Sequence, residues 1–222
     1  MIHAALPAFS LRKFLLCVLL ALMLAGCGQQ DSATFAPLPR DAVVLVIGDS
    51  LVAGTGAPSG AGWPEALAQR TGWQVVNGGV PGDTSADALR RLDGLIAEYR
   101  PQAIVIAIGG NDFLRNVPLD ATRANIEHMI RDSRAASTHV GLVAIPAKSV
   151  GAALIGNLSD HAVFAELAQA QAHELALVPE VIADVLSRDE LRADRIHANA
   201  SGYAQIADGV AEALRRQGWL VR

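Results

Sequence analysis

Cysteine is almost absent from this chain of 222 residues, which contains only Cys17 and Cys27. The whole stretch after Cys27 lacks cysteine, so it can form neither an internal disulfide nor a cysteine-ligated zinc site. Its stability must therefore come from a hydrophobic core. Hydrophobic residues make up 51% of the chain, which is enough for a sizeable core in one domain that carries an N-terminal tail.

Charged residues are also scarce, at 18% of the chain, and no run of five or six like charges occurs. The formal net charge of −4 at pH 7 argues against nucleic acid as a partner, because binding to phosphates requires a basic face. The phosphate-loop motif Gly-Lys-Ser/Thr is missing. Gly54-Thr55-Gly56 lacks the third glycine of a dinucleotide-binding motif, since Ser59 stands in its place. We therefore expect neither a nucleotide nor a nucleic acid as ligand.

The N-terminal segment has the pattern of a signal peptide. Arg12 and Lys13 precede an apolar stretch of 11 residues, 14–24, which is too short to span a bilayer as a stable helix. Leu24-Ala25-Gly26-Cys27 then resembles a bacterial lipobox, in which the cysteine becomes the lipidated first residue of the mature protein. More than one acyl chain gives stable anchoring, so we expect a membrane-anchored lipoprotein. The alternative is an ordinary secretory signal followed by a chance cysteine.

This interpretation divides the chain into a lipoprotein signal peptide at 1–26, a flexible tether at 27–40 and a folded domain at 41–222. The tether is weakly apolar and contains Gln, Ser and Pro residues. Gly28, rather than Asp, follows Cys27, which in the resembled sorting system favours the periplasmic side of the outer membrane. We therefore expect an exported protein of a bacterial cell envelope that reaches the membrane through lipid on Cys27.

The body of the chain alternates between apolar runs and amphipathic segments. The runs are typical of parallel strands buried on both faces, and the segments between them repeat apolar residues at helical spacing. This alternation predicts an α/β fold with a parallel sheet, right-handed crossovers and helices on both faces. The expected strands are 43–47, 74–77, 103–108, 140–145 and 175–178, and the expected helices are 63–71, 83–99, 120–137, with Asp120 as its cap, and 200–217.

Gly48-Asp49-Ser50-Leu51 follows the first expected strand directly. A serine at the exit of a buried strand presents its hydroxyl at the carboxyl edge of the sheet, where open α/β sheets bind their ligands. A serine nucleophile needs a base. His197 is the best candidate, because in Asp194-x-x-His197 the carboxylate of Asp194 can fix its tautomer. The chain has no Gly-x-Ser-x-Gly, which disfavours the nucleophile elbow of α/β-hydrolases.

Acyl transfer also requires hydrogen-bond donors aimed at the developing oxyanion. Three candidates follow expected strands: the N–H of Ser50, the N–H of Gly82 and the side-chain amide of Asn111. Gly82 has no Cβ, so a substrate can approach its N–H closely. Because parallel strands end at one edge of a sheet, we expect these donors to lie near the serine hydroxyl.

Taken together, these segments resemble the four sequence blocks of the SGNH (GDSL) hydrolase family, over nearly all of 41–222. Within that family, Val75-Val76-Asn77, Gly82-Asp83-Thr84-Ser85 and Gly109-Gly110-Asn111-Asp112 are most similar to the bacterial multifunctional thioesterase I/lysophospholipase L1/arylesterase group. The resemblance implies a flavodoxin-like three-layer α/β/α sandwich around a mostly parallel five-stranded sheet.

The same resemblance implies roles for individual residues. Ser50, Asp194 and His197 would form a catalytic triad, and Ser50, Gly82 and Asn111 an oxyanion hole. The family uses no metal and no organic cofactor, so we expect none. Asp49 would support its neighbours by hydrogen bonding, without a catalytic role of its own.

Two segments bear on the substrate. Phe113–Pro118 corresponds by position to a mobile loop that contacts acyl chains in the resembled group, which makes Phe113, Leu114, Val117 and Pro118 candidate substrate-binding residues. The alternative is that these side chains only pack the loop. Pro146–Asp160 is rich in small apolar residues and is either a functional loop or a simple connection.

We therefore predict a serine esterase that hydrolyses carboxylic esters through an acyl-enzyme on Ser50. Its substrate would be a small-molecule or lipid ester: a lysophospholipid, an aryl ester, a short- to medium-chain acyl ester or a thioester. One alternative is a carbohydrate O-acetylesterase of the cell envelope with the same triad in an open cleft. The other is a non-catalytic binding lipoprotein, although binding alone does not need serine, histidine and oxyanion donors together. We expect a monomer.

Overall fold

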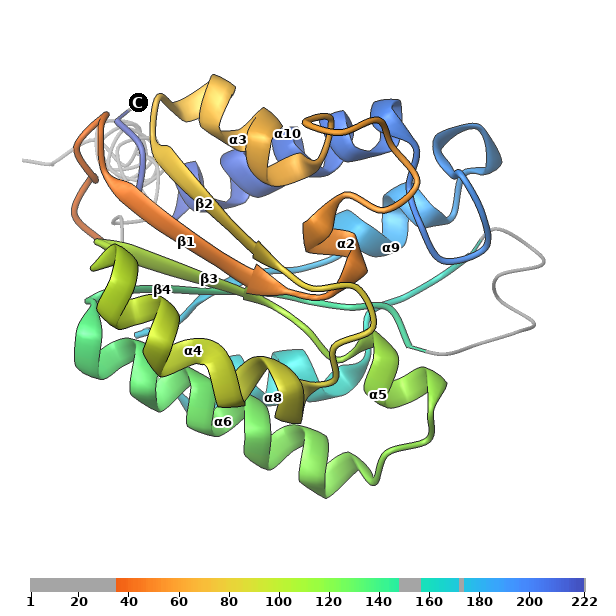
Figure 1. Cartoon of the computed structure of the whole chain (residues 1–222), viewed down its shortest axis with the longest axis horizontal. Helices are drawn as coiled ribbons and strands as arrows, with labels where there is room; N and C mark the ends of the chain where they lie inside the picture. The colour runs from red at the N-terminus through yellow and green to blue at the C-terminus, as the bar shows by residue number, and fades with distance from the viewer. Residues whose placement is uncertain (1–34, 148–156, 172–173, 222) are drawn as a thin grey trace, which may run out of the picture. The chain divides into compact units, whose positions relative to one another are not determined.

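Five apolar runs of the chain pair into one parallel sheet in the computed structural model (Figure 1). The strand order is β2-β1-β3-β4-β5. The strands are β1 (Val43–Gly48), β2 (Gln74–Gly79), β3 (Ala103–Ala107), β4 (His139–Val143) and β5 (Ala176–Val178). Every residue of β3 and all but the first of β1 are buried, because helices cover both faces of the sheet. The predicted α/β fold with a parallel five-stranded sheet is confirmed.

The structure describes residues 35–147, 157–171 and 174–221, which all belong to one unit of the chain, 33–222. Cys27, the predicted signal peptide and most of 146–160 lie outside the described residues. No helix in the described ranges has both the length and the apolar composition needed to cross a bilayer. These ranges also contain no group of three or more His, Cys, Asp or Glu side chains arranged to hold a metal ion.

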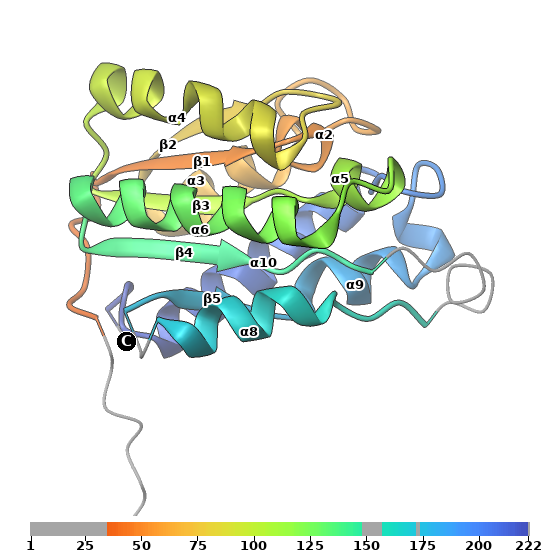
Figure 2. The ribbon, with the colours of Figure 1, turned by 90° about the horizontal axis from the view of Figure 1, so that it is seen from below.

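Helices form a layer on each face of the sheet (Figures 1 and 2). Helices α3 and α10 pack against each other on one face, with α9 beside α10, while α4, α6 and α8 cover the other face. The longer helices are α3 (Trp63–Thr71), α4 (Ser85–Tyr99), α6 (Leu119–Ala136), α8 (Ala162–Ala170) and α10 (Ala200–Arg216). The shorter elements are α2 (Ser50–Ala53), α5 (Gly110–Leu114), α9 (Val181–Leu186) and the 3-10 turn η1 (Asp189–Leu191).

The helix starts show how local sequence fixes the boundaries. Helix α4 begins after a capping box, in which the Thr84 hydroxyl accepts from the Asp87 amide and the Asp87 carboxylate accepts from the Thr84 amide. The prediction that Asp120 caps α6 is wrong. Pro118 is the N-cap, and its fixed φ of −52° starts the helix one residue earlier than expected, so that Asp120 lies in the first turn. An acidic side chain there still favours the positive end of the helix dipole.

Two strands end at residues other than those expected from the apolar pattern, because pairing with a neighbouring strand decides where a strand ends. The fourth strand was expected to reach Ile145, but β4 ends at Val143 because its neighbour β5 is only three residues long. The amide of Ala144 makes one further bond, to the Val178 carbonyl, at 3.0 Å. Conversely, β2 extends past Asn77 to Gly79, because Gly78 and Gly79 pair with the last residues of β1.

The last part of the expected tether lies against the domain. The amide of Phe35 donates to the Gln217 carbonyl at 3.0 Å, and that of Leu38 donates to the Trp219 carbonyl at 2.9 Å. The Leu38 side chain is buried. Residues 35–38 therefore contribute to the hydrophobic core beside the end of the chain.

The strand order opens a crevice for a ligand at the carboxyl edge of the sheet, between β1 and β3. The chain continues from β1 to β2 on one side, and then returns to β3 on the other side of β1. The loops after β1 and β3 therefore leave the carboxyl edge of the sheet in opposite directions and open a crevice between them. Ser50 follows β1 and Asn111 follows β3, so the topology alone brings both to this crevice.

Candidate active site

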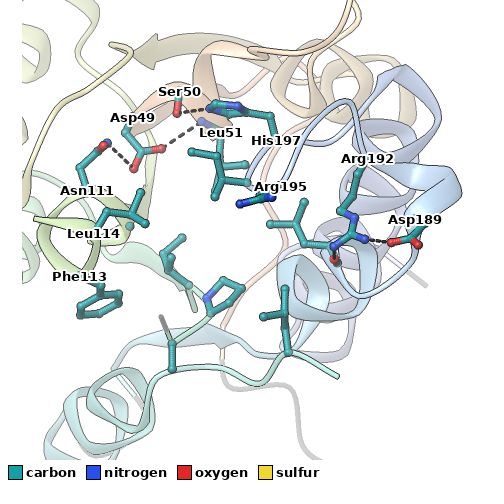
Figure 3. A pocket seen from close by; sticks show the side chains of 17 residues that line it. Asp49, Ser50, Leu51, Asn111, Phe113, Leu114, Asp189, Arg192, Arg195 and His197 are labelled. Carbon is teal, nitrogen blue, oxygen red and sulfur yellow. Dashed lines mark hydrogen bonds and ion pairs between the residues drawn. The ribbon is translucent and has the colours of Figure 1, made fainter. Parts of the chain in front are cut away.

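Three polar side chains form a hydrogen-bonded chain at the carboxyl edge of the sheet. The Ser50 hydroxyl lies 3.0 Å from Nε2 of His197 (Figure 3). Nδ1 of the same ring lies 2.7 Å from Oδ2 of Asp194. An ionised carboxylate only accepts hydrogen bonds, so Nδ1 carries the proton and Nε2 is left as the acceptor for the serine hydroxyl. Residues 147 positions apart thus meet in the relationship expected of nucleophile and base.

Tight packing under Ser50 fixes the position of its hydroxyl. Gly48 ends β1 and packs against β3 and α2. A Cβ on Gly48 would lie 2.2 Å from the Ala107 carbonyl oxygen and 2.4 Å from the Val52 side chain. Only glycine fits there. The chain then turns directly into α2, whose first residue is Ser50.

A short loop holds the histidine and its carboxylate together. Oδ1 of Asp194 accepts from the amides of Ile196 and His197, both at 2.8 Å, while Oδ2 accepts from the His197 ring. Partial burial alone would raise the pKa of Asp194. The hydrogen bonds from the ring and the two amides outweigh this effect and lower the pKa below its usual value. Asp194 therefore stays ionised near neutral pH.

The three predicted oxyanion donors differ in what they already bind. The amides of Ser50 and Gly82 have no acceptor among the residues that the structure describes. Gly82 adopts a φ of +87°, which favours glycine, and its carbonyl accepts from the Arg115 guanidinium at 2.9 Å. The side-chain amide of Asn111, by contrast, donates to Oδ2 of Asp49 at 3.3 Å and to the Asp83 carbonyl at 3.0 Å.

Asp49 is the buried acid beside this group. Its side chain is 2% exposed, caps α2 through the amide of Leu51, and accepts from Asn111. Burial raises the pKa of Asp49 to about 6, against the opposing effects of the Leu51 hydrogen bond and the nearby His197. The supporting role that the resemblance implied for Asp49 agrees with these contacts.

A cavity of about 460 Å³ opens beside Ser50 and His197, within the usual range for small-molecule sites. Phe113 and Leu114 line it, as the sequence predicted, but Val117 and Pro118 are not among its lining residues. Pro118 caps α6, and the Val117 amide donates to the Asp112 carbonyl at 2.9 Å. A role of these two residues in substrate binding stays a prediction.

The remaining lining residues are ones to which the sequence assigned no individual role. Apolar side chains dominate them: Leu51, Ile145, Pro146, Ala147, Leu158, Leu186 and Ile196. Three charged residues join them near the C-terminal loop: Asp189, Arg192 and Arg195. Arg195 and Ile196 stand between Asp194 and His197, and Leu51 follows Ser50 in its motif. Pro146, Ala147 and Leu158 belong to the segment 146–160, which the sequence left open as a functional loop or a connection.

A buried network holds the neighbouring helices in place. Asp112 is fully buried and accepts from the Ser85 amide at 2.8 Å, the Ser85 hydroxyl at 2.5 Å and the Thr122 hydroxyl at 3.2 Å. These bonds join α5 to α4 and α6. The sequence showed Asp112 only as part of a motif, without this role of orienting the segment that carries Asn111.

Comparisons with known proteins agree with this geometry. The family described as GDSL-like Lipase/Acylhydrolase matches residues 46–205. Esterase TesA of Pseudomonas aeruginosa is 36% identical over 130 residues, which cover 56% of this chain and 64% of that protein. The thioesterase 1/protease 1/lysophospholipase L1 of Escherichia coli K12 is 31% identical over 189 residues, covering 82% of this chain and 87% of that protein.

A solved structure of TesA superimposes with a TM-score of 0.68 at 31% identity and covers 78% of this chain and 98% of its own. A structure of the psychrotrophic esterase EstA from Pseudoalteromonas, described as inhibited by monoethylphosphonate, has a TM-score of 0.66 at 25% identity and covers 79% and 97%. The family match, the relatives and the fold agree, and the protein therefore belongs to the GDSL-like lipase/acylhydrolase family of hydrolases.

Proposed function

We propose that this protein is a serine esterase that hydrolyses carboxylic esters through an acyl-enzyme on Ser50. The observation that carries the proposal is the hydrogen-bonded chain from the Ser50 hydroxyl through the His197 ring to Asp194, with distances of 3.0 and 2.7 Å. This chain borders a cavity large enough for a small ester. Relatives named esterase, thioesterase/lysophospholipase and arylesterase support the same chemistry.

In the first half-reaction, Nε2 of His197 takes the hydroxyl proton of Ser50 while Oγ forms a bond to the ester carbonyl carbon. Asp194 stabilises the imidazolium that results. When the tetrahedral intermediate collapses, the carbon–oxygen bond to the alcohol breaks and Nε2 gives its proton to the departing oxygen. A water molecule then repeats both steps on the acyl-enzyme and releases the carboxylic acid and the free serine.

The negative oxygen of the intermediate needs donors that are already in place. The amides of Ser50 and Gly82 are suitable, because neither has an acceptor among the described residues. Asn111 is the third donor in this proposal. Its amide must shift one hydrogen from Asp49 or Asp83 toward the oxyanion, or share it between the two acceptors.

The apolar part of the cavity supports an acyl chain as the group bound there. Phe113, Leu114, Ile145, Leu158 and Leu186 offer hydrocarbon surface beside the serine. We propose lysophospholipids, aryl esters and short- to medium-chain acyl esters as substrates, with thioesters as further candidates. The names of the relatives cover these classes.

We also propose that the enzyme works as an exported lipoprotein. The support lies in the sequence alone: the basic residues before the apolar stretch 14–24, and Leu24-Ala25-Gly26-Cys27 after it. Lipid on Cys27 would hold 41–222 at the periplasmic side of the outer membrane. Mass spectrometry of the membrane-extracted N-terminus tests this proposal, and an unmodified residue 27, or a start elsewhere, would contradict it.

The catalytic proposal is tested with purified protein and p-nitrophenyl butyrate. Ser50→Ala should lose hydrolysis by at least about 10³-fold and lose labelling by a fluorophosphonate probe, because both reactions require the nucleophile. Ser59→Ala, which removes an exposed serine near the same segment, is the matched control and should behave as wild type. Substantial turnover by Ser50→Ala would refute the role of Ser50.

A series of esters with acyl chains from acetyl to palmitoyl tests the substrate class. Best activity on medium chains supports the acyl-binding role of the apolar wall. A steep preference for acetyl would favour the carbohydrate O-acetylesterase instead. Absence of both turnover and labelling in the wild-type protein would favour a non-catalytic binding protein.

A further inference from the structure

The two walls of the cavity differ in chemistry (Figure 3). Phe113, Leu114 and Asn111 lie on one side of the view, on the segment that follows β3. His197, Arg195 and Arg192 lie on the opposite side, on the C-terminal loop. One wall is therefore mainly apolar, and the other carries two guanidinium groups.

The two arginines are not equivalent. The guanidinium of Arg192 pairs with Asp189 and also donates to the Leu186 carbonyl at 3.2 Å, and its side chain is only 15% exposed. Both contacts of Arg192 are with residues of its own segment, so its guanidinium stabilises the loop. Arg195 is exposed and lines the cavity, and it has no acceptor or ion-pair partner within 35–147, 157–171 and 174–221.

The nearest carboxylate in the sequence does not neutralise Arg195. Both oxygens of Asp194 are engaged, by the amides of Ile196 and His197 and by the His197 ring. A guanidinium always carries its charge and offers a planar set of donors that matches a carboxylate or a phosphate. The donors of Arg195 therefore remain available to a ligand in the cavity.

The proposed mechanism says which part of a substrate would meet Arg195, and this step rests on the proposed function. Nε2 of His197 gives its proton to the departing alcohol, so the alcohol portion must lie along the wall that carries His197. The acyl chain then lies toward the apolar wall of Phe113 and Leu114. Arg195 is two residues before His197 on the same loop, beside the alcohol portion.

We propose that Arg195 is a specificity-determining residue that binds an anionic group, a phosphate or a carboxylate, on the alcohol portion of the ester. The preferred substrates are esters with an uncharged acyl chain and a negatively charged alcohol. Arg195 does not touch the reacting atoms, so it should affect binding of such esters much more than the turnover of neutral ones.

The test compares substrates that share an acyl chain and differ in charge. The first pair is p-nitrophenyl butyrate and its ring-carboxylated analogue. The second pair is a monoacylglycerol and the corresponding monoacylglycerol phosphate, which has the same acyl chain. The two pairs distinguish a carboxylate from a phosphate as the preferred anion.

Arg195→Gln should lower kcat/KM for an anionic ester by about tenfold, mainly through KM, and leave the neutral partner within about twofold. Arg195→Lys should lower kcat/KM for the anionic ester less than Arg195→Gln does, because lysine keeps the charge but lacks the planar donors. Added NaCl should lower the ratio of kcat/KM for the anionic ester over its neutral partner in the wild type. It should have little effect on the same ratio in Arg195→Gln. Arg131→Gln, which removes an exposed arginine from α6, is the control for net charge.

The outcomes separate this inference from the esterase proposal. If the wild type hydrolyses neutral esters and Arg195→Gln changes both members of each pair equally, the anion-binding role is overturned and the esterase stands. If the wild type hydrolyses no ester of either charge, the proposed function itself fails.

Discussion

The side-chain amide of Asn111 donates a hydrogen bond to the buried carboxylate of Asp49, across 3.3 Å between Nδ2 and Oδ2. The acid directly before the proposed nucleophile thus orients a proposed oxyanion donor from a different strand end. The same amide is held on its other side by the Asp83 carbonyl, at 3.0 Å. Because Asp49 is 2% exposed, its charge state matters both for the stability of the fold and for the placement of Asn111.

Asp49 should make the protein less stable as the pH rises. Its pKa in the folded protein is about 6, against 3.8 as the ordinary value, so the folded state favours the protonated form. The stabilisation is present below pH 4 and is lost as the pH rises through about 6. From below pH 4 to above pH 6, Asp49 should remove up to about 3 kcal/mol from the free energy of unfolding. Urea titrations at several pH values measure this loss.

Asp49→Asn is the variant that isolates this effect. It cannot ionise, so its stability should fall less steeply with pH than that of the wild type. The difference between the two curves should grow between about pH 4 and pH 6 and level off above pH 6. Other shifted carboxylates, such as Asp160 and Asp194, contribute to both proteins and cancel in the difference. Parallel curves for the two proteins would show that Asp49 does not titrate in this range.

Asp194→Asn should impair the proposed catalysis through the tautomer of His197. In the wild type the carboxylate accepts from Nδ1 and leaves Nε2 free to accept from Ser50. An asparagine amide that donates to Nδ1 would favour the proton on Nε2, which then cannot take the serine proton. We expect kcat for p-nitrophenyl butyrate to fall by about 10³-fold. Asp184→Asn, an exposed acid on α9, is the control and should retain activity.

The apolar wall should set the preference for acyl-chain length. Leu114→Ala removes hydrocarbon surface from the cavity and should lower the ratio of kcat/KM for octanoyl over acetyl esters by about fivefold. Val117→Ala, three residues later and not among the lining residues, should leave the ratio unchanged. Equal effects of the two substitutions would mean that the loop acts through its packing and not through contact with the acyl chain.

The sequence anticipated the sheet well because its signals are local. Five apolar runs, the motif after the first strand and the polar residues after the third could all be read within short windows. Parallel topology then predicted that Ser50, Gly82 and Asn111 would gather at one edge of the sheet. The hydrogen bond of 3.3 Å from Asn111 to Asp49 joins the segments that follow the third and first strands at that edge.

The errors concern features that depend on a partner element. The cap of α6 moved from Asp120 to Pro118, and β4 stopped at Val143 because β5 offers only three residues for pairing. Val117 was expected in the acyl groove because of its place in the loop. Val117 is not among the lining residues of the cavity, and its contact with a substrate stays a prediction.

By itself, the amino-acid sequence determined the five apolar runs that form the sheet and the polar motifs that follow the first and third of them, because periodicity and local motifs require only neighbouring residues. Only the tertiary structure decided that Asn111 bonds Asp49, that Arg192 is paired while Arg195 faces the cavity, and which apolar side chains form its wall. These outcomes depend on contacts between segments far apart in the chain, and no local pattern specifies the distance or direction at which such segments meet.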